Sequence, residues 1–167
     1  MESMIGQFVG GVAFIIGTSA FLQKDDIKFR VLMALFCMLM AMHFYLIGAI
    51  IGAIGVSINA VRILVSIYSK SQLVMWAFII ALIGFSIPSV THLMEVLPIA
   101  GSVVGTYALF RLQGLKMRGL ILFNSLCWAI HNIWAGSIGG SLVEMAFVVS
   151  NIITITRLLA WQRTQII

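Results

Sequence analysis

An internal duplication constrains this chain more than any other feature. The pattern Ala-x-His-x-x-x-x-Gly-x-Ile-x-Gly occurs at residues 41–52 and again at 129–140. Each matched residue lies 88 positions after its counterpart (131 minus 43 for the histidines). The same offset joins five earlier pairs: Gly17 and Gly105, Thr18 and Thr106, Ala20 and Ala108, Arg30 and Arg118, and Leu32 and Leu120. The chain is therefore a duplicated unit, and its fold must accommodate two copies.

The composition identifies the solvent of this fold. Of the 167 residues, 62% are hydrophobic and only 9% are charged, whereas about a quarter of a typical soluble domain is charged. Because apolar spans of about 20 residues cross a bilayer, we expect a multi-pass membrane protein whose main partner is lipid. The net charge of +5 is explained better by membrane topology than by nucleic-acid binding, and no nucleic-acid partner is expected.

Polar residues and helix breakers divide the chain into seven expected transmembrane helices, which makes the fold all-α. Glycine clusters separate the second helix from the third and the sixth from the seventh, and Pro88 ends the fourth because proline lacks the backbone N–H of a continuing helix. The expected ranges are 4–22, 31–47, from after the Gly48–Gly52 turn to 68, 73–87, 94–109, 117–135, and from after Gly139-Gly140 to 161.

The basic residues predict the topology. Every Lys and Arg lies in or nearest to 23–30, 69–72, 111–118 or the C-terminal end, which fall on one side when seven helices alternate. Basic residues are retained in the cytoplasm, so the N-terminus is expected outside and the C-terminus inside. The domain plan is a single membrane domain over 1–167, in a 3+1+3 arrangement: triple-helix repeat A at 4–69, a linker helix at 72–89 and repeat B at 93–161. One linker helix makes the two repeats parallel, as in some transporter folds.

Polar residues inside the expected helices are the candidates for a site, because such residues usually face the bundle interior or a water-filled cavity. The first candidates for solute binding are Asn59, Asn151, His43 and His131. The two asparagines differ by 92 positions, one helical turn beyond the repeat offset, and their amides suit hydroxyl-rich or amide-like solutes. For each residue the alternative is an interhelical hydrogen bond; for the histidines a proton-linked gate is a further reading.

Further candidates lie on the sixth and seventh helices and on the third. Trp128, Trp134 and Asn124 are added to the solute-binding set, with an interfacial position as the alternative for Trp134. Residues Arg62, Glu144 and Asn132 are candidates for gating or coupling. Arg62 needs a partner or an inward-facing cavity, and Glu144 is either interfacial or proton-coupled.

No catalytic arrangement is visible in the sequence. There is no Ser-His-Asp set, paired acids or phosphate loop, and Cys37 and Cys127 fall singly inside apolar segments without metal-ligand spacing. We therefore expect no enzyme activity, no metal and no cofactor. A homo-oligomer is compatible with the sequence.

The motifs resemble those of a known family. The stretch from Trp128 to Gly140, together with Leu97-Pro98-Ile-Ala-Gly101 and Ala108-Leu-Phe-Arg111, closely resembles the bacterial inner membrane protein family typified by YgjV. The likeness extends through Ile58–Arg62 and Phe14–Gly17 and covers nearly the whole chain. It implies a multi-pass protein of the bacterial inner (plasma) membrane.

At a greater distance, the 3+1+3 plan with an outer N-terminus is similar to the SWEET and PQ-loop transporters. That resemblance implies a central sugar-like site between the two repeats, lined by Asn59, Asn151 and Trp128 or Trp134. The Pro-Gln hinge of those transporters is absent, since the first helix has no proline and the fifth has only Pro98 near its start. The expected function is a SWEET-like carrier or facilitator of a small sugar-like or amino-acid-like solute by alternating access. The alternative is a non-transporting scaffold, partner subunit or small-molecule sensor.

Overall fold

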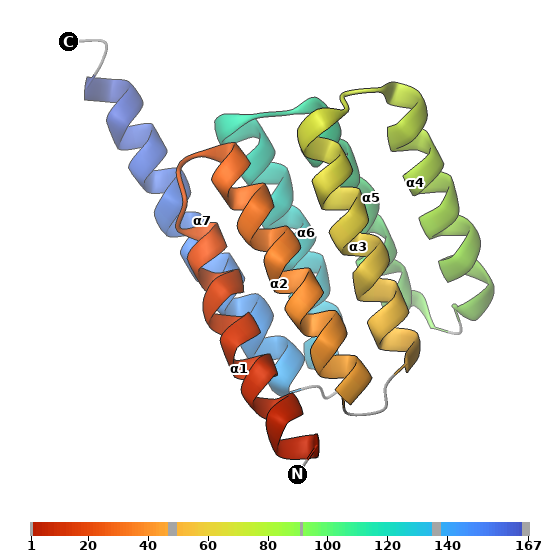
Figure 1. The fold of residues 1–167 in the computed structure, drawn as a ribbon. Coiled ribbons are helices and arrows are strands. Elements are labelled where there is room, and N and C mark those ends of the chain that lie inside the picture. Colours follow the sequence, from red (N-terminus) through yellow and green to blue (C-terminus); the bar gives the residue numbers. More distant parts are fainter. Residues whose placement is uncertain (1, 47–49, 91, 135–137, 165–167) are drawn as a thin grey trace. The chain divides into compact units, whose positions relative to one another are not determined.

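A computed structural model describes residues 2–46, 50–90, 92–134 and 138–164 (Figure 1). Within these ranges the chain is all-helical, and the seven expected helices are confirmed. They are α1 (Glu2–Phe21), α2 (Asp26–Leu46), α3 (Ile50–Tyr68), α4 (Gln72–Ser86), α5 (Val96–Arg111), α6 (Gly114–Trp134) and α7 (Ile138–Thr164). Two short 3-10 helices, η1 (Ile87–Ser89) and η2 (Leu93–Glu95), lie between α4 and α5.

The ends of two helices differ from the prediction for local reasons. Helix α2 begins at Asp26, five residues before the expected Val31, because its first turn tolerates charge. The backbone N–H of Lys28 donates to Oδ1 of Asp25 at 2.7 Å, which satisfies one of the unpaired donors of a helix start. Helix α6 likewise begins early, at Gly114, whose φ of 57° suits glycine.

The glycine-containing turns before α3 and before α7 are also shorter than predicted. Gly52 belongs to the first turn of α3, and Gly139 and Gly140 belong to the first turn of α7. The chain reversals that Gly48 and Gly136 were expected to form lie outside the described residues. Pro88 behaves as expected, since α4 ends at Ser86 and the proline sits in η1.

The chain divides into two compact units, Met1–Tyr68 (unit 1) and Ser69–Ile167 (unit 2). In unit 1, α2 packs against both α1 and α3; in unit 2, α6 packs against both α5 and α7, and α4 packs on α5 (Figure 1). In each expected triple-helix repeat, the second helix (α2 or α6) therefore packs between the other two, and we call it the central helix of its unit. The parallel relation between the two triplets and their orientation in the membrane stay predictions.

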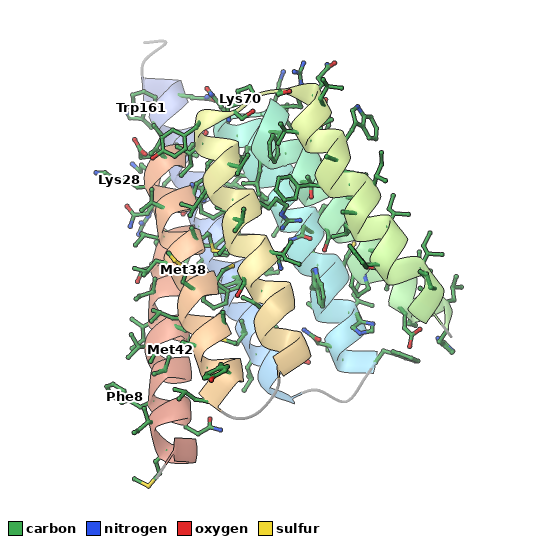
Figure 2. The ribbon with its side chains drawn as sticks, turned by 45° about the vertical axis from the view of Figure 1, so that its right-hand side comes forward. Phe8, Lys28, Met38, Met42, Lys70 and Trp161 are labelled. Carbon is green, nitrogen blue, oxygen red and sulfur yellow. The ribbon has the colours of Figure 1, made fainter. Side chains whose placement is uncertain are left out.

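The outer surfaces of the helices suit lipid. Three described segments are long and apolar enough to cross a membrane: Met4–Phe21, Leu93–Arg111 and Ser141–Gln162. Large apolar side chains are exposed on them and on their neighbours: Phe8, which projects from α1 in Figure 2, is 73% exposed, and Phe85 on α4 is 81% exposed. Contiguous surface of this kind is rare on soluble monomers, and it is what hydrocarbon chains would cover.

Small residues bring the helices together inside each unit. Ala13, Ala20 and Ala34 are fully buried in unit 1. In unit 2, Gly101 and Gly105 of α5 face Asn124 of α6, so closely that a Cβ on Gly101 would lie 2.9 Å from the Cβ of Cys127. Close backbone approach through small residues is the usual packing of membrane helices.

Candidate functional site

The duplicated histidines occupy equivalent places in the two units. Nδ1 of His43 is 2.8 Å from the backbone oxygen of Gly6, and Nδ1 of His131 is 3.2 Å from the backbone oxygen of Met94. Both pairs are 37 residues apart, so the two carbonyls also obey the repeat offset. A carbonyl only accepts, so Nδ1 is the donor in both histidines. The bond of His43 ties α2 to α1, which is the contact that the interhelical alternative requires, and the bond of His131 ties α6 to η2, directly before α5.

In unit 1, Gly10 creates the space for this bond. A Cβ added to Gly10 would lie 2.9 Å from Nδ1 and 3.1 Å from Cε1 of His43. The neighbouring Gly11 has nothing within 4 Å of the same position. The imidazole of His43 is therefore seated directly on the backbone of α1.

The C-terminal end of α6 carries a cluster of rings around the second histidine. The rings of His92 and Trp134 are stacked at 4.5 Å, Trp134 lies 5.8 Å from His131, and Trp128 meets His131 edge-on at 6.2 Å. Nε1 of Trp128 donates to Oγ of Ser102 on α5 at 3.2 Å. The structure thus brings Trp128, His131 and Trp134 together, and it adds His92 and Ser102, which the sequence did not single out.

His92 also organises the turn before α5. The N–H of Met94 donates to Nδ1 of His92 at 3.2 Å, and the N–H of His92 donates to Oε2 of Glu95 at 3.0 Å. This reciprocal arrangement is a capping box. Because the oxygen of the same Met94 accepts from His131, one residue connects both histidines of unit 2.

The contact between α6 and α7 contains two polar layers. In the first, called the Asn151 layer, Nδ2 of Asn151 donates to the backbone oxygen of Arg118 at 2.9 Å. In the second, called the Glu144 layer, the side chain of Ser125 hydrogen-bonds to the carboxyl of Glu144. Seven residues, or about two turns, separate the layers along each helix. The residue numbers rise from the Asn151 layer to the Glu144 layer on α6 and fall on α7, because the two helices run in opposite directions.

Apolar side chains separate these layers. Ile121 on α6 and Phe147 on α7 lie between them in sequence and are 5% and 4% exposed. Asn151 is itself 0% exposed. The polar groups are therefore enclosed in an otherwise apolar contact, where an unmet hydrogen bond is costly.

Three buried side-chain oxygens of unit 2 have no hydrogen-bond partner among the described residues: Oδ1 of Asn151, Oε2 of Glu144 and Oδ1 of Asn124. All three are acceptors. Asn124 packs on Gly101 and Gly105 of α5, whereas the other two belong to the α6–α7 contact. The structure therefore places the predicted residues of unit 2 on two sides of α6 and not in one pocket.

Unit 1 has its own polar contacts between α2 and α3. Nη1 of Arg30, which is 2% exposed, donates to the backbone oxygen of Ser66 at 2.7 Å and to its Oγ at 3.2 Å. Arg62 of α3 is half-buried and lies close enough to the buried Cys37 of α2 to interact with it electrostatically. The arginine thus faces the central helix of its unit, as a residue needing a partner would.

The two candidate asparagines lie at different levels of their units. Arg30 and Arg118 are repeat counterparts, and Asn151 is level with Arg118. Asn59 is half-buried on α3 and lies seven residues, two turns, before Ser66, which is level with Arg30. The offset of 92 positions therefore does not give the two amides equivalent places.

Asn132 is half-buried near the end of α6. Within the described ranges, no group of three or more His, Cys, Asp or Glu side chains is placed to hold a metal ion. The serine partners Ser66, Ser102 and Ser125 were missed because serine is common in loops and helices alike. The only signal for Ser125 was its two-turn spacing from Arg118 on one face of α6.

Apolar helices with lipid-compatible surfaces and polar groups turned into helix contacts define an integral, multi-pass membrane protein. The chain belongs to the bacterial inner membrane protein family Imp-YgjV, whose model matches residues 4–162. It is 36% identical to the inner membrane protein YgjV of Escherichia coli (strain K12) over 159 residues, which are 95% of this chain and 87% of that protein. The resemblance inferred from the motifs is confirmed, and the location is the bacterial inner membrane. No solved structure matches the chain.

Proposed function

We propose that this protein is a carrier or facilitator of a small polar solute and works by alternating access. The observation that carries the proposal is the amide of Asn151, which is fully buried on an apolar helix and has only its Nδ2 group engaged. Polar groups inside membrane helices are expensive and tend to mark solute pathways. An amide used only for helix packing would satisfy its oxygen as well.

The buried oxygens without a hydrogen-bond partner indicate which groups a bound solute would carry. Oδ1 of Asn151 and Oδ1 of Asn124 accept hydrogen bonds. A matching solute carries hydroxyl or N–H donors, as sugar-like and amino-acid-like molecules do. In this proposal the faces of Trp128 and Trp134 supply apolar contact to such a solute, while Asn59 and Arg62 act in unit 1.

A second function, a non-transporting scaffold or sensor, is favoured by a different observation. In both units a histidine of the central helix bonds to a backbone oxygen, on α1 in unit 1 and on η2, just before α5, in unit 2, which stiffens each unit. Pro98 is the third residue of α5, where a missing N–H is tolerated without a kink. Stiff units without proline hinges suit a protein that presents surfaces and does not move a solute.

Uptake into proteoliposomes tests the carrier. The full chain is reconstituted and offered a panel of labelled sugars, polyols and amino acids. We expect uptake of at least one class, reduced at least tenfold by Asn151→Leu, which keeps the branched shape of the side chain and removes the amide. The matched control is Gln113→Ala, which removes an exposed amide between α5 and α6 and should leave uptake unchanged. If the folded wild-type chain takes up no member of the panel, the scaffold replaces the carrier.

A further inference from the structure

Glu144 differs from every other acid of this chain in its surroundings. The chain has five Asp and Glu residues, and four of them lie at helix ends or in turns: Glu2, Asp25, Asp26 and Glu95. Glu144 instead lies opposite Ser125, which is at the middle of the 21-residue α6. Along α7 it is the fourth residue of the apolar segment Ser141–Gln162, and its carboxyl lies in the contact with α6.

No cation of unit 2 faces this carboxyl among the described residues. Helix α6 is the element packed against α7, and its ionisable residues point elsewhere or lie at other levels: Lys116 and Arg118 are two turns or more away, Cys127 packs at Gly101 of α5, and His131 bonds to Met94. On α7 itself, Arg157 is more than three turns away. Ser125 supplies the side-chain hydrogen bond, and Oε2 has no partner in the part of the chain that the structure describes.

We propose that Glu144 is a proton-binding site and that it carries the coupling proton of this carrier, the second part resting on the proposed function. Glu144 is half-buried, and its Oε2 is buried without a partner among the described residues. An ionised carboxylate in such a place, with one hydroxyl partner, is poorly stabilised. A proton on Oε2 removes the charge and needs no cavity, which suits a tightly packed helix contact.

The proton step is simple in its chemistry. The O–H bond forms when a hydronium ion on one side of the membrane transfers its proton to the carboxylate and is left as water. It breaks when the carboxyl meets water on the other side, and the proton leaves as hydronium. The hydroxyl of Ser125 holds the carboxyl in place in both states, since it donates to the other carboxyl oxygen whether or not Oε2 carries the proton. No other bond changes.

Infrared difference spectroscopy of the full chain in lipid bilayers tests the proton site without any solute. At neutral pH we expect the carbonyl stretch of a protonated carboxylic acid, and with only five acidic side chains the assignment is tractable. Glu144→Gln should abolish this band. Asp25→Asn should leave it intact, because Asp25 is exposed in a turn and asparagine also caps a helix.

Ser125→Ala gives a second test if Glu144→Gln fails to fold, because loss of the hydroxyl should move the frequency of the same band. Absence of a protonated carboxyl band in the folded wild type at neutral pH, or its persistence in Glu144→Gln, overturns the proton site. A band that depends on Glu144, in a chain that takes up no solute, supports the proton site and refutes the carrier. Solute uptake that collapses with the proton gradient in wild type, but not in Glu144→Gln, supports both.

Discussion

Replacing Gly10 with alanine tests whether the duplicated histidine is a structural fastening. The new methyl group would lie 2.9 Å from Nδ1 of His43, the same atom that bonds to Gly6 at 2.8 Å. Carbon atoms essentially never approach so closely, so either the imidazole or α1 must move. Gly11→Ala provides the matched control, because its methyl group would meet nothing within 4 Å.

The magnitude follows from comparing the two variants. Alanine stabilises a helix by roughly 0.5–1 kcal/mol relative to glycine, and this gain cancels between neighbouring positions of α1. Overpacking costs about 1–3 kcal/mol, and an interhelical hydrogen bond in a membrane protein contributes about 0.6 kcal/mol on average. We therefore expect Gly10→Ala to be about 2–3 kcal/mol less stable than Gly11→Ala, adding the midrange overpacking cost to the lost bond.

Reversible unfolding in mixed micelles, followed by circular dichroism, measures this difference. The same substitution in a His43→Ala background completes a double-mutant cycle. With the imidazole gone, the penalty at Gly10 should largely disappear. Equal stability of the Gly10 and Gly11 variants, or a penalty that persists without His43, would refute the reasoning.

Two further tests use glycines of unit 2, one for close packing and one for backbone strain. Gly101→Ala should destabilise the protein by about 1–3 kcal/mol, because its Cβ would lie 2.9 Å from the Cβ of Cys127. The control, Gly119→Ala, places its Cβ where nothing lies within 4 Å. It should be neutral or slightly stabilising in the same unfolding measurement. Gly114→Ala should lower the stability by about 1–2 kcal/mol through backbone strain alone, because φ is 57° and the space around the Cβ is open. Gly114→Asn should lower it by less. Equal losses of stability for the two variants would contradict the strain argument.

The helices of this protein were predictable because apolar runs of membrane length, interrupted by Pro88 and charged turns, leave few alternatives. The histidines were predictable as a pair because the repeat marks them. Their partners were not, since Gly6 and Met94 contribute backbone oxygens that every residue has. Sequence spacing therefore cannot distinguish one carbonyl from another.

The levels of the polar groups were the least predictable feature. An offset of one helical turn preserves the face of a helix but moves a residue along its axis, so Asn59 and Asn151 were matched by face and differ in depth. The Glu144 layer depends on the register between α6 and α7, which places Ser125 opposite Glu144. Such a register comes from packing at the other end of the contact, where Asn151 meets Arg118.

Comparison of the two units separates what the duplication kept from what it changed. In each unit a histidine connects the central helix to a backbone oxygen, on α1 in unit 1 and on η2 before α5 in unit 2. A polar contact connects the central helix to the next helix, through the guanidinium of Arg30 in unit 1 and the backbone oxygen of its counterpart Arg118 in unit 2.

Midway between these contacts the central helices present Cys37 and Ser125, which are themselves separated by the repeat offset. The third helices place different charges near them, the cation of Arg62 in unit 1 and the acid of Glu144 in unit 2. These two residues do not occupy matched positions, because Arg62 lies one turn from Ser66 whereas Glu144 lies two turns from Asn151. Charged residues inside membrane helices are costly and tend to be functional, so tests of function should concentrate on Arg62 and Glu144.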